Sequence, residues 1–191
     1  LQHRVKNNMQ TILSMLGATR RRGPDWDWDA FIDTLNRRLM AMATVQQLMY
    51  QSSRLDTIPA GDFLTALTRS IAHSFNVRCE LSVVVEVEDI PSEIAFTIAL
   101  ITNELLSNAF KYGLRNGEGQ VRVELVRQDH GYRLRVQDDG PGFPPQGEER
   151  RDSGLGLVRG LCRQIGGSLH TETREGACCS IRFPVPEPAV S

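Results

Sequence analysis

The chain has little charge imbalance, few cysteines and no long apolar run. Its net charge is −1, so the composition favours neither a nucleic acid nor an anionic membrane surface as a partner. The four cysteines include no C-x-x-C pair, and no histidine stands at zinc-ligand spacing from them. Reduced, mostly buried thiols and a cytoplasmic location are therefore expected. No apolar stretch approaches the roughly 20 residues that span a bilayer, and no signal peptide is present, so we expect no membrane contact in this segment.

Two amphipathic helical patterns fill the first quarter of the chain. The first begins at Leu1 without a capping residue, which suggests a fragment of a longer protein. Gly23 and Pro24 break it, and a second pattern follows to about Gln51. Such neighbours form an antiparallel hairpin, and two helices cannot enclose a core alone. We therefore expect residues 1–54 to form half of a dimeric four-helix bundle; the alternative is that the hairpin packs on its own chain. The two apolar seams are Leu1, Val5, Met9, Ile12 and Leu16, then Phe31, Leu35, Leu39, Met42, Val45 and Met49.

Residues 55–186 alternate between strand and helix patterns. Period-two runs predict strands, and runs of period 3.6 bounded by Pro or Gly predict helices. Blocks of this kind predict an α/β sandwich, with helices on one face of a mixed sheet, so that the whole chain is of the α+β class. Residues 187–191 are expected to be a loose tail. The predicted helices follow Pro59 and cover 91–112 and 155–165, and the predicted strands cover 79–87, 121–126, 132–138, 168–173 and 178–183.

The predicted helix 91–112 carries three polar residues in one row. Glu104, Asn108 and Lys111 stand at steps of four and three, beside the apolar stripe. An amide oxygen suits Mg²⁺, an ammonium suits phosphate, and a carboxylate can take a proton or orient a water. The alternative is a polar stripe exposed to solvent. Considered without the other motifs, this row of residues favours that alternative.

A carboxylate ends the predicted strand 132–138. Alternation places Asp138 on the same face as Val136, which should be the core face. A carboxylate there is costly unless a group donates to it, and an adenine amino group is a fitting donor. Gly140 and Gly142 would let the backbone turn beside a ligand, although Asp-Gly and Pro-Gly are also ordinary turn residues.

Small residues precede the predicted helix 155–165. The run Ser153 to Leu157 would expose amide hydrogens at a helix N-terminus, which is a natural phosphate site. A Gly-x-Gly at a helix start is common, so this motif is weak alone, and the P-loop string is absent.

Together, the three motifs resemble the ATPase domain of histidine kinases, Hsp90, type II topoisomerases and MutL, the GHKL superfamily with its Bergerat fold. Residues 103–112 resemble the N box, 138–142 the G1 box and 154–157 the G2 box. The resemblance implies ATP and Mg²⁺ as ligands, with Asp138 at the adenine amino group and Asn108 on Mg²⁺. Further nucleotide contacts that it implies come from Lys111, Tyr112, Gly140, Gly142, Gly154, Leu155, Gly156 and Leu157.

Two features depart from the family pattern. The family tends to place a threonine after a glycine near the last strand, where this chain has Gly176 and Ala177. The resemblance makes residues 143–153 the ATP lid, which is short and shows no F box. Both departures bear on how tightly the site holds ATP.

The N-terminal string HRVKNNMQ begins at His3. His3 and Asn7 lie on the face away from the apolar seam, so the histidine is expected to be exposed. The string resembles the phosphoacceptor box of the HRxxN class of histidine kinases, which are relatives of the HWE class. The HWE class carries a histidine in the N box and a Trp-x-Glu before the G1 box, where this chain has Asn103 and Tyr132-Arg133-Leu134. The resemblance implies that His3 accepts the phosphoryl group, with Arg4 and Asn7 beside it.

These features predict autophosphorylation on His3, with Glu104 as the candidate base, followed by transfer to an aspartate of a response-regulator receiver in two-component signalling. Two alternatives stay open. One is a non-catalytic histidine phosphotransfer protein with a degenerate ATPase domain. The other is a serine kinase of the anti-sigma type, which does not need a histidine-bearing hairpin.

Overall fold

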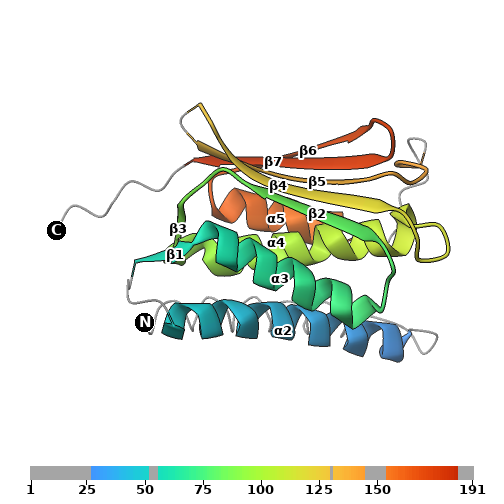
Figure 1. Ribbon diagram of the computed structural model, residues 1–191, viewed down its shortest axis with the longest axis horizontal. Helices are drawn as coiled ribbons and strands as arrows, with labels where there is room; N and C mark the ends of the chain where they lie inside the picture. The colour runs from blue at the N-terminus through green and yellow to red at the C-terminus, as the bar shows by residue number, and fades with distance from the viewer. Residues whose placement is uncertain (1–26, 52–55, 130, 145–153, 185–191) are drawn as a thin grey trace.

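The computed structural model describes residues 27–51, 56–129, 131–144 and 154–184. Its main layers are a five-stranded sheet and the helices that cover one face of it, with helix α2 outermost (Figure 1). Among the described helices, none combines the length and the apolarity that crossing a bilayer requires. The predicted α+β class, with helices on one face of a mixed sheet, is confirmed.

The sheet has the strand order β2-β4-β5-β7-β6. β2 and β4 are parallel and the other neighbours antiparallel, so the sheet is mixed as predicted. The β4–β5 hairpin turns at Asp129, whose φ of 52° suits the left-handed region that Asp tolerates in turns. The strands are β2 (Glu80–Val85), β4 (Gln120–Gln128), β5 (Gly131–Asp138), β6 (Ser168–Thr173) and β7 (Ala177–Pro184).

Three helices pack beneath the sheet. α3 (Ala60–Phe75) and α4 (Ser92–Asn108) follow prolines, which suit the first turn of a helix. α5 (Leu155–Gln164) ends before Gly166, whose φ is +67°. The apolar stripe predicted on α4 faces the core, and its members are at most 7% exposed: Ile94, Ile98, Ile101 and Leu105.

A second, two-stranded sheet was not predicted from the sequence. β1 (Thr57–Pro59) pairs antiparallel with β3 (Asp89–Pro91). Each strand has three residues, too few to show alternation, and each ends in the proline that precedes a helix. The pairing fixes the starts of α3 and α4 side by side.

Helix α2 (Trp28–Gln51) lies along α3 and α4, on their side away from the sheet (Figure 1). Ala41, Met42 and Val45 are buried in the same core as the rest of the chain. Two members of the predicted dimer seam, Met42 and Val45, therefore pack on their own chain, which was the alternative. The first helix of the expected hairpin lies outside the described residues, so the dimeric bundle stays a prediction.

The described cysteines are all free thiols. Cys162, Cys178 and Cys179 are buried and Cys79 is partly so, in line with the expectation of mostly buried thiols. Burial raises the pKa of Cys162 to about 11 and that of Cys179 to about 12. These two thiols are therefore protonated and unreactive at neutral pH.

Candidate functional site

Asp138 is the last residue of β5 and points into the core side of the sheet. The strand alternates as predicted, with Tyr132, Leu134, Val136 and Asp138 buried; the carboxylate residue is 6% exposed. Its Oδ1 accepts hydrogen bonds from the backbone N–H groups of Gly140, at 3.0 Å, and Ala177, at 3.1 Å. Because both described donors reach Oδ1, Oδ2 is left to accept from an outside amino group.

Glycines allow the backbone to come close to Asp138. A Cβ at Gly113 would collide with the Asp138 carboxyl group, and one at Gly140 would collide with the Gly113 carbonyl. Gly176, with φ of +129°, lies against the Asp138 carbonyl in the same way. The G1 turn can therefore contact the end of the N box only because both Gly113 and Gly140 lack a side chain. In the same way, Gly176 lets the backbone N–H of Ala177 reach the Asp138 carboxylate.

Position 177 contributes through its backbone. Since the N–H of Ala177 bonds to Asp138, the replacement of the family's threonine by alanine leaves this contact in place. Elsewhere at this edge, Thr173 Oγ1 accepts a bond from the N–H of Phe143 at 3.1 Å, which fixes the start of the predicted lid segment. Gly142, with φ of +80°, packs against Thr173.

The N box ends in a π-helical turn, Ala109–Gly113. Asn108 is the last residue of α4, and Lys111 and Tyr112 lie on the turn that brings Gly113 to Asp138. Lys111 is exposed, while Asn108 and Tyr112 are half-buried. Single π turns are frequent at functional sites. Here the wider turn brings Gly113, which follows the three predicted ligand residues, against Asp138 and Gly140.

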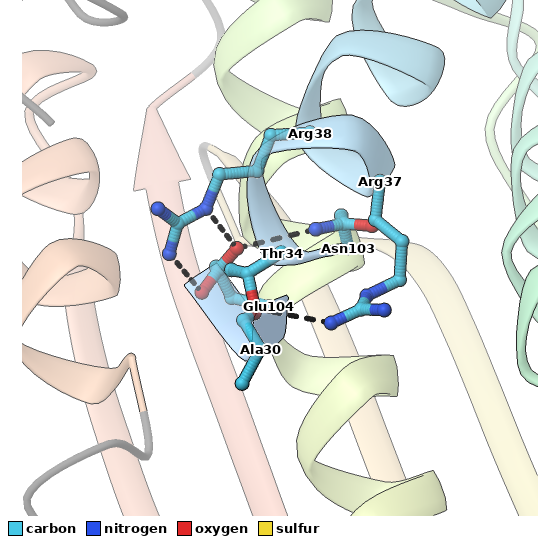
Figure 2. Close-up of polar contacts among 6 residues, drawn as sticks. All are labelled: Ala30, Thr34, Arg37, Arg38, Asn103 and Glu104. Carbon is cyan, nitrogen blue, oxygen red and sulfur yellow. Dashed lines mark hydrogen bonds and ion pairs between the residues drawn. The ribbon is translucent and has the colours of Figure 1, made fainter. Parts of the chain in front are cut away.

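Glu104 is not part of a solvated stripe, which was the alternative for this row. It is 5% exposed and forms a two-bond ion pair with Arg38 of α2 (Figure 2). Arg38 Nε lies 2.7 Å from Glu104 Oε1, and Arg38 Nη2 lies 2.8 Å from Oε2. The amide of Asn103 also donates to Oε1, at 3.2 Å. Sequence reasoning missed Arg38, which looked like one of many charges on an amphipathic helix.

The start of α5 faces Glu104. Gly154 adopts a left-handed φ of +67°, and a Cβ there would collide with Glu104 Oε2. Among the described residues, no side chain caps the helix, so its first amides remain available to a ligand. The N-box carboxylate and the G2 amides are thereby brought together, as expected for a site that handles phosphate.

The described residues fit a nucleotide with its magnesium ion. Oδ2 of Asp138 suits an adenine amino group, and glycines let the G1 turn and the end of the N box pack directly against this carboxylate. Within the described ranges, no cluster of three or more His, Cys, Asp or Glu side chains is arranged to hold a metal. Mg²⁺ would instead be held by Asn108 together with phosphate oxygens, an arrangement that this ion commonly uses. His3, Arg4 and Asn7 lie outside the described residues.

As the pH is lowered, adenosine binding should begin to weaken at a higher pH than it would if Asp138 had the pKa of an ordinary aspartate. Burial, the largest cause, raises the pKa of Asp138; its two amide hydrogen bonds oppose this rise and Asp139 adds to it. As pH falls through this raised pKa, the carboxylate is protonated and stops accepting from the amino group. Adenosine titrations from pH 7.5 to 4.5 test this without phosphate ionisation, and constant affinity over that range would contradict it.

Two family models match the chain. One, described as "Histidine kinase", matches residues 1–75, and the other, described as "Histidine kinase-, DNA gyrase B-, and HSP90-like ATPase", matches residues 93–187. The chain is 29% identical to blue-light-activated histidine kinase 2 of Erythrobacter litoralis, over 97% of this chain and 56% of that protein. It is also 29% identical to the sensor histidine kinase PdtaS of Mycobacterium tuberculosis, over 97% of this chain and 38% of that protein. The chain thus spans about half or less of these relatives.

Solved structures share the fold. A blue-light activated histidine kinase of Erythrobacter litoralis superposes with a TM-score of 0.76 at 24% identity, covering 96% of this chain and 63% of that one. The ATP-binding domain of PrrB from Mycobacterium tuberculosis gives 0.55 at 24% identity, covering 69% and 98%. The two family models together confirm the resemblance to histidine kinases and their GHKL ATPase unit, and the chain belongs to the sensor histidine kinase family.

Proposed function

We propose that this chain is the transmitter part of a sensor kinase, which uses ATP to phosphorylate its own His3 and then passes the phosphoryl group to an aspartate of a response-regulator receiver. The observation that carries the proposal is the convergence of three motifs along the C-terminal half of α4. Glu104 lies against Gly154, and the turn after Asn108 lies against Asp138. A nucleotide held at Asp138 would thus extend its phosphates toward Glu104 and α5.

The residues divide the work of phosphoryl transfer. Asp138 orients the adenine, the amides of α5 bind phosphate oxygens, and Asn108 helps to hold Mg²⁺. Bound Mg²⁺ supplies positive charge that offsets the charge developing on the phosphates. His3 attacks as a neutral imidazole, which Arg4 favours because a like charge disfavours imidazolium. Glu104 takes the ring proton.

The partners follow from the same proposal. Histidine kinases of this family imply a receiver-domain partner, and Asn7, one turn from the acceptor, would face that partner together with His3. We propose that the hairpin of residues 1–54 also forms the homodimer, through apolar side chains other than the buried Met42 and Val45. The dimer requires α2 to expose a further apolar surface, and Trp28, Ile32, Leu39, Met40 and Tyr50 are all exposed large apolar or aromatic side chains.

Replacing His3 with alanine should abolish self-labelling. Incubation with γ-labelled ATP is expected to give an acid-labile, base-stable label on the native chain and none on His3→Ala. His73→Ala is the matched control, because His73 is exposed on α3 and should leave labelling unchanged. Label that persists on His3→Ala would remove His3 as the acceptor, and an unlabelled native chain that still binds ATP would favour the non-catalytic alternative.

A further inference from the structure

Two neighbouring arginines of α2 contact residues of the ATP-binding unit. Arg38 holds Glu104 of α4 through two hydrogen bonds, and the guanidinium of Arg37 lies 4.6 Å from the ring centroid of Phe75 on α3. Arg37 also donates to Thr34 at 3.0 Å, which fixes its direction (Figure 2). The apolar residues Ala41, Met42 and Val45 continue the same face of α2. This docking face joins the helix that follows the acceptor segment to the domain that should supply the phosphate.

The ion pair occupies the groups that catalysis needs. Each carboxylate oxygen of Glu104 accepts from Arg38, and Oε1 accepts from Asn103 as well. The pair is shielded from water, with side-chain exposures of 13% for Arg38 and 6% for Glu104. Arg38 therefore engages both oxygens of the carboxylate that would have to accept the imidazole proton. Its Oε2 also lies against Gly154, where the α5 amides would meet phosphate.

The docking face contains a buried polar atom that has no hydrogen-bond partner among the described residues. Among the described residues, Asn103 Oδ1 is buried and has no hydrogen-bond partner, although its amide nitrogen donates to Glu104. Buried polar atoms in folded proteins are nearly always paired. The unpaired oxygen makes this contact less stable than a fully hydrogen-bonded one.

We propose that the Arg38–Glu104 ion pair is an inhibitory contact, which holds α2 on the ATP-binding unit and must open before Glu104 can serve in autophosphorylation. This inference rests on the proposed kinase function. In the open state, one ring nitrogen of His3 forms a bond to the γ-phosphorus. The bond from that phosphorus to the bridging oxygen breaks, and its electron pair leaves with ADP. The proton on the other ring nitrogen goes to the freed Glu104 carboxylate.

The test compares single-turnover autophosphorylation of the native chain, Arg38→Gln and Arg38→Lys at saturating ATP. Releasing Glu104 should raise the rate about fivefold or more in Arg38→Gln, as expected for the loss of an ordinary coupling between two sites. Arg38→Lys keeps the charge but lacks the two-bond fork, so its rate should lie between the two. Arg122→Gln is the matched control, because it breaks an Arg–Glu bond of the same 2.7 Å length on β4, in the sheet; its rate should equal the native one.

The outcomes separate the inference from the function on which it rests. Far-ultraviolet circular dichroism and an ATP titration confirm that each variant is folded, and Arg38→Lys decides the matter where Arg38→Gln does not fold. A rate that is unchanged or lower in a folded, ATP-binding Arg38 variant overturns the inhibitory contact, while the kinase function stands. Absence of label from the native chain and every variant overturns the kinase function, and the inhibitory contact with it.

Discussion

Asp138→Asn is expected to weaken ATP binding by about 10- to 100-fold, the factor that corresponds to losing one hydrogen bond to a charged group. The amide keeps one oxygen, which can still accept from Gly140 and Ala177. Its nitrogen then takes the place of Oδ2 and turns a donor toward the donor on adenine. The backbone frame therefore survives while the recognition of the base is lost.

The matched control for this substitution is Asp139→Asn. Asp139 is the adjacent residue, carries the same charge and is exposed, whereas Asp138 is buried. Isothermal titration with ATP should show native affinity for the Asp139 variant. Equal affinities of both variants would mean that Asp138 serves only to hold the turn. The thermal midpoint checks the frame, because a collapsed turn would lower it in Asp138→Asn alone.

Residue periodicity was enough to predict that Asp138 lies on the buried face of its strand. The alternation of β5 gave the face of each residue correctly, since one buried side leaves only one register for a strand. The same reasoning gave the buried stripe of α4 and the five strands of the main sheet. Each of these elements is long enough to contain several repeats of its hydrophobic period, so that the pattern can be recognised in the sequence.

Features that depend on tertiary contacts could not be predicted from the sequence. The predicted helix 91–112 gives way to a π turn at Ala109, where Gly113 is drawn against Asp138, and no local propensity encodes that approach. The Arg38–Glu104 pair joins residues 66 apart in sequence. A periodic pattern shows that a helix face is polar, but it does not show which charge on another helix will lie opposite.

Glu104→Gln should slow autophosphorylation by about 10²- to 10⁴-fold, the usual contribution of a general base. Glutamine fills nearly the same volume and still offers one oxygen to Arg38, but it does not accept a proton at neutral pH. ATP affinity should change little, because Asp138 and the α5 amides remain. The measurement is the rate of label incorporation at saturating ATP, with the affinity determined separately.

Glu124→Gln is the control for this substitution. Glu124 is also buried and also paired with arginine, through Arg122 and Arg135 on the sheet, so its loss costs a similar ion pair away from the site. A native rate in Glu104→Gln would show that another group accepts the proton. The double variant Arg38→Gln/Glu104→Gln is more discriminating: if Arg38 acts only by restraining Glu104, the double variant should be as slow as Glu104→Gln alone. A double variant faster than Glu104→Gln would show that Arg38 restrains α2 itself rather than the carboxylate.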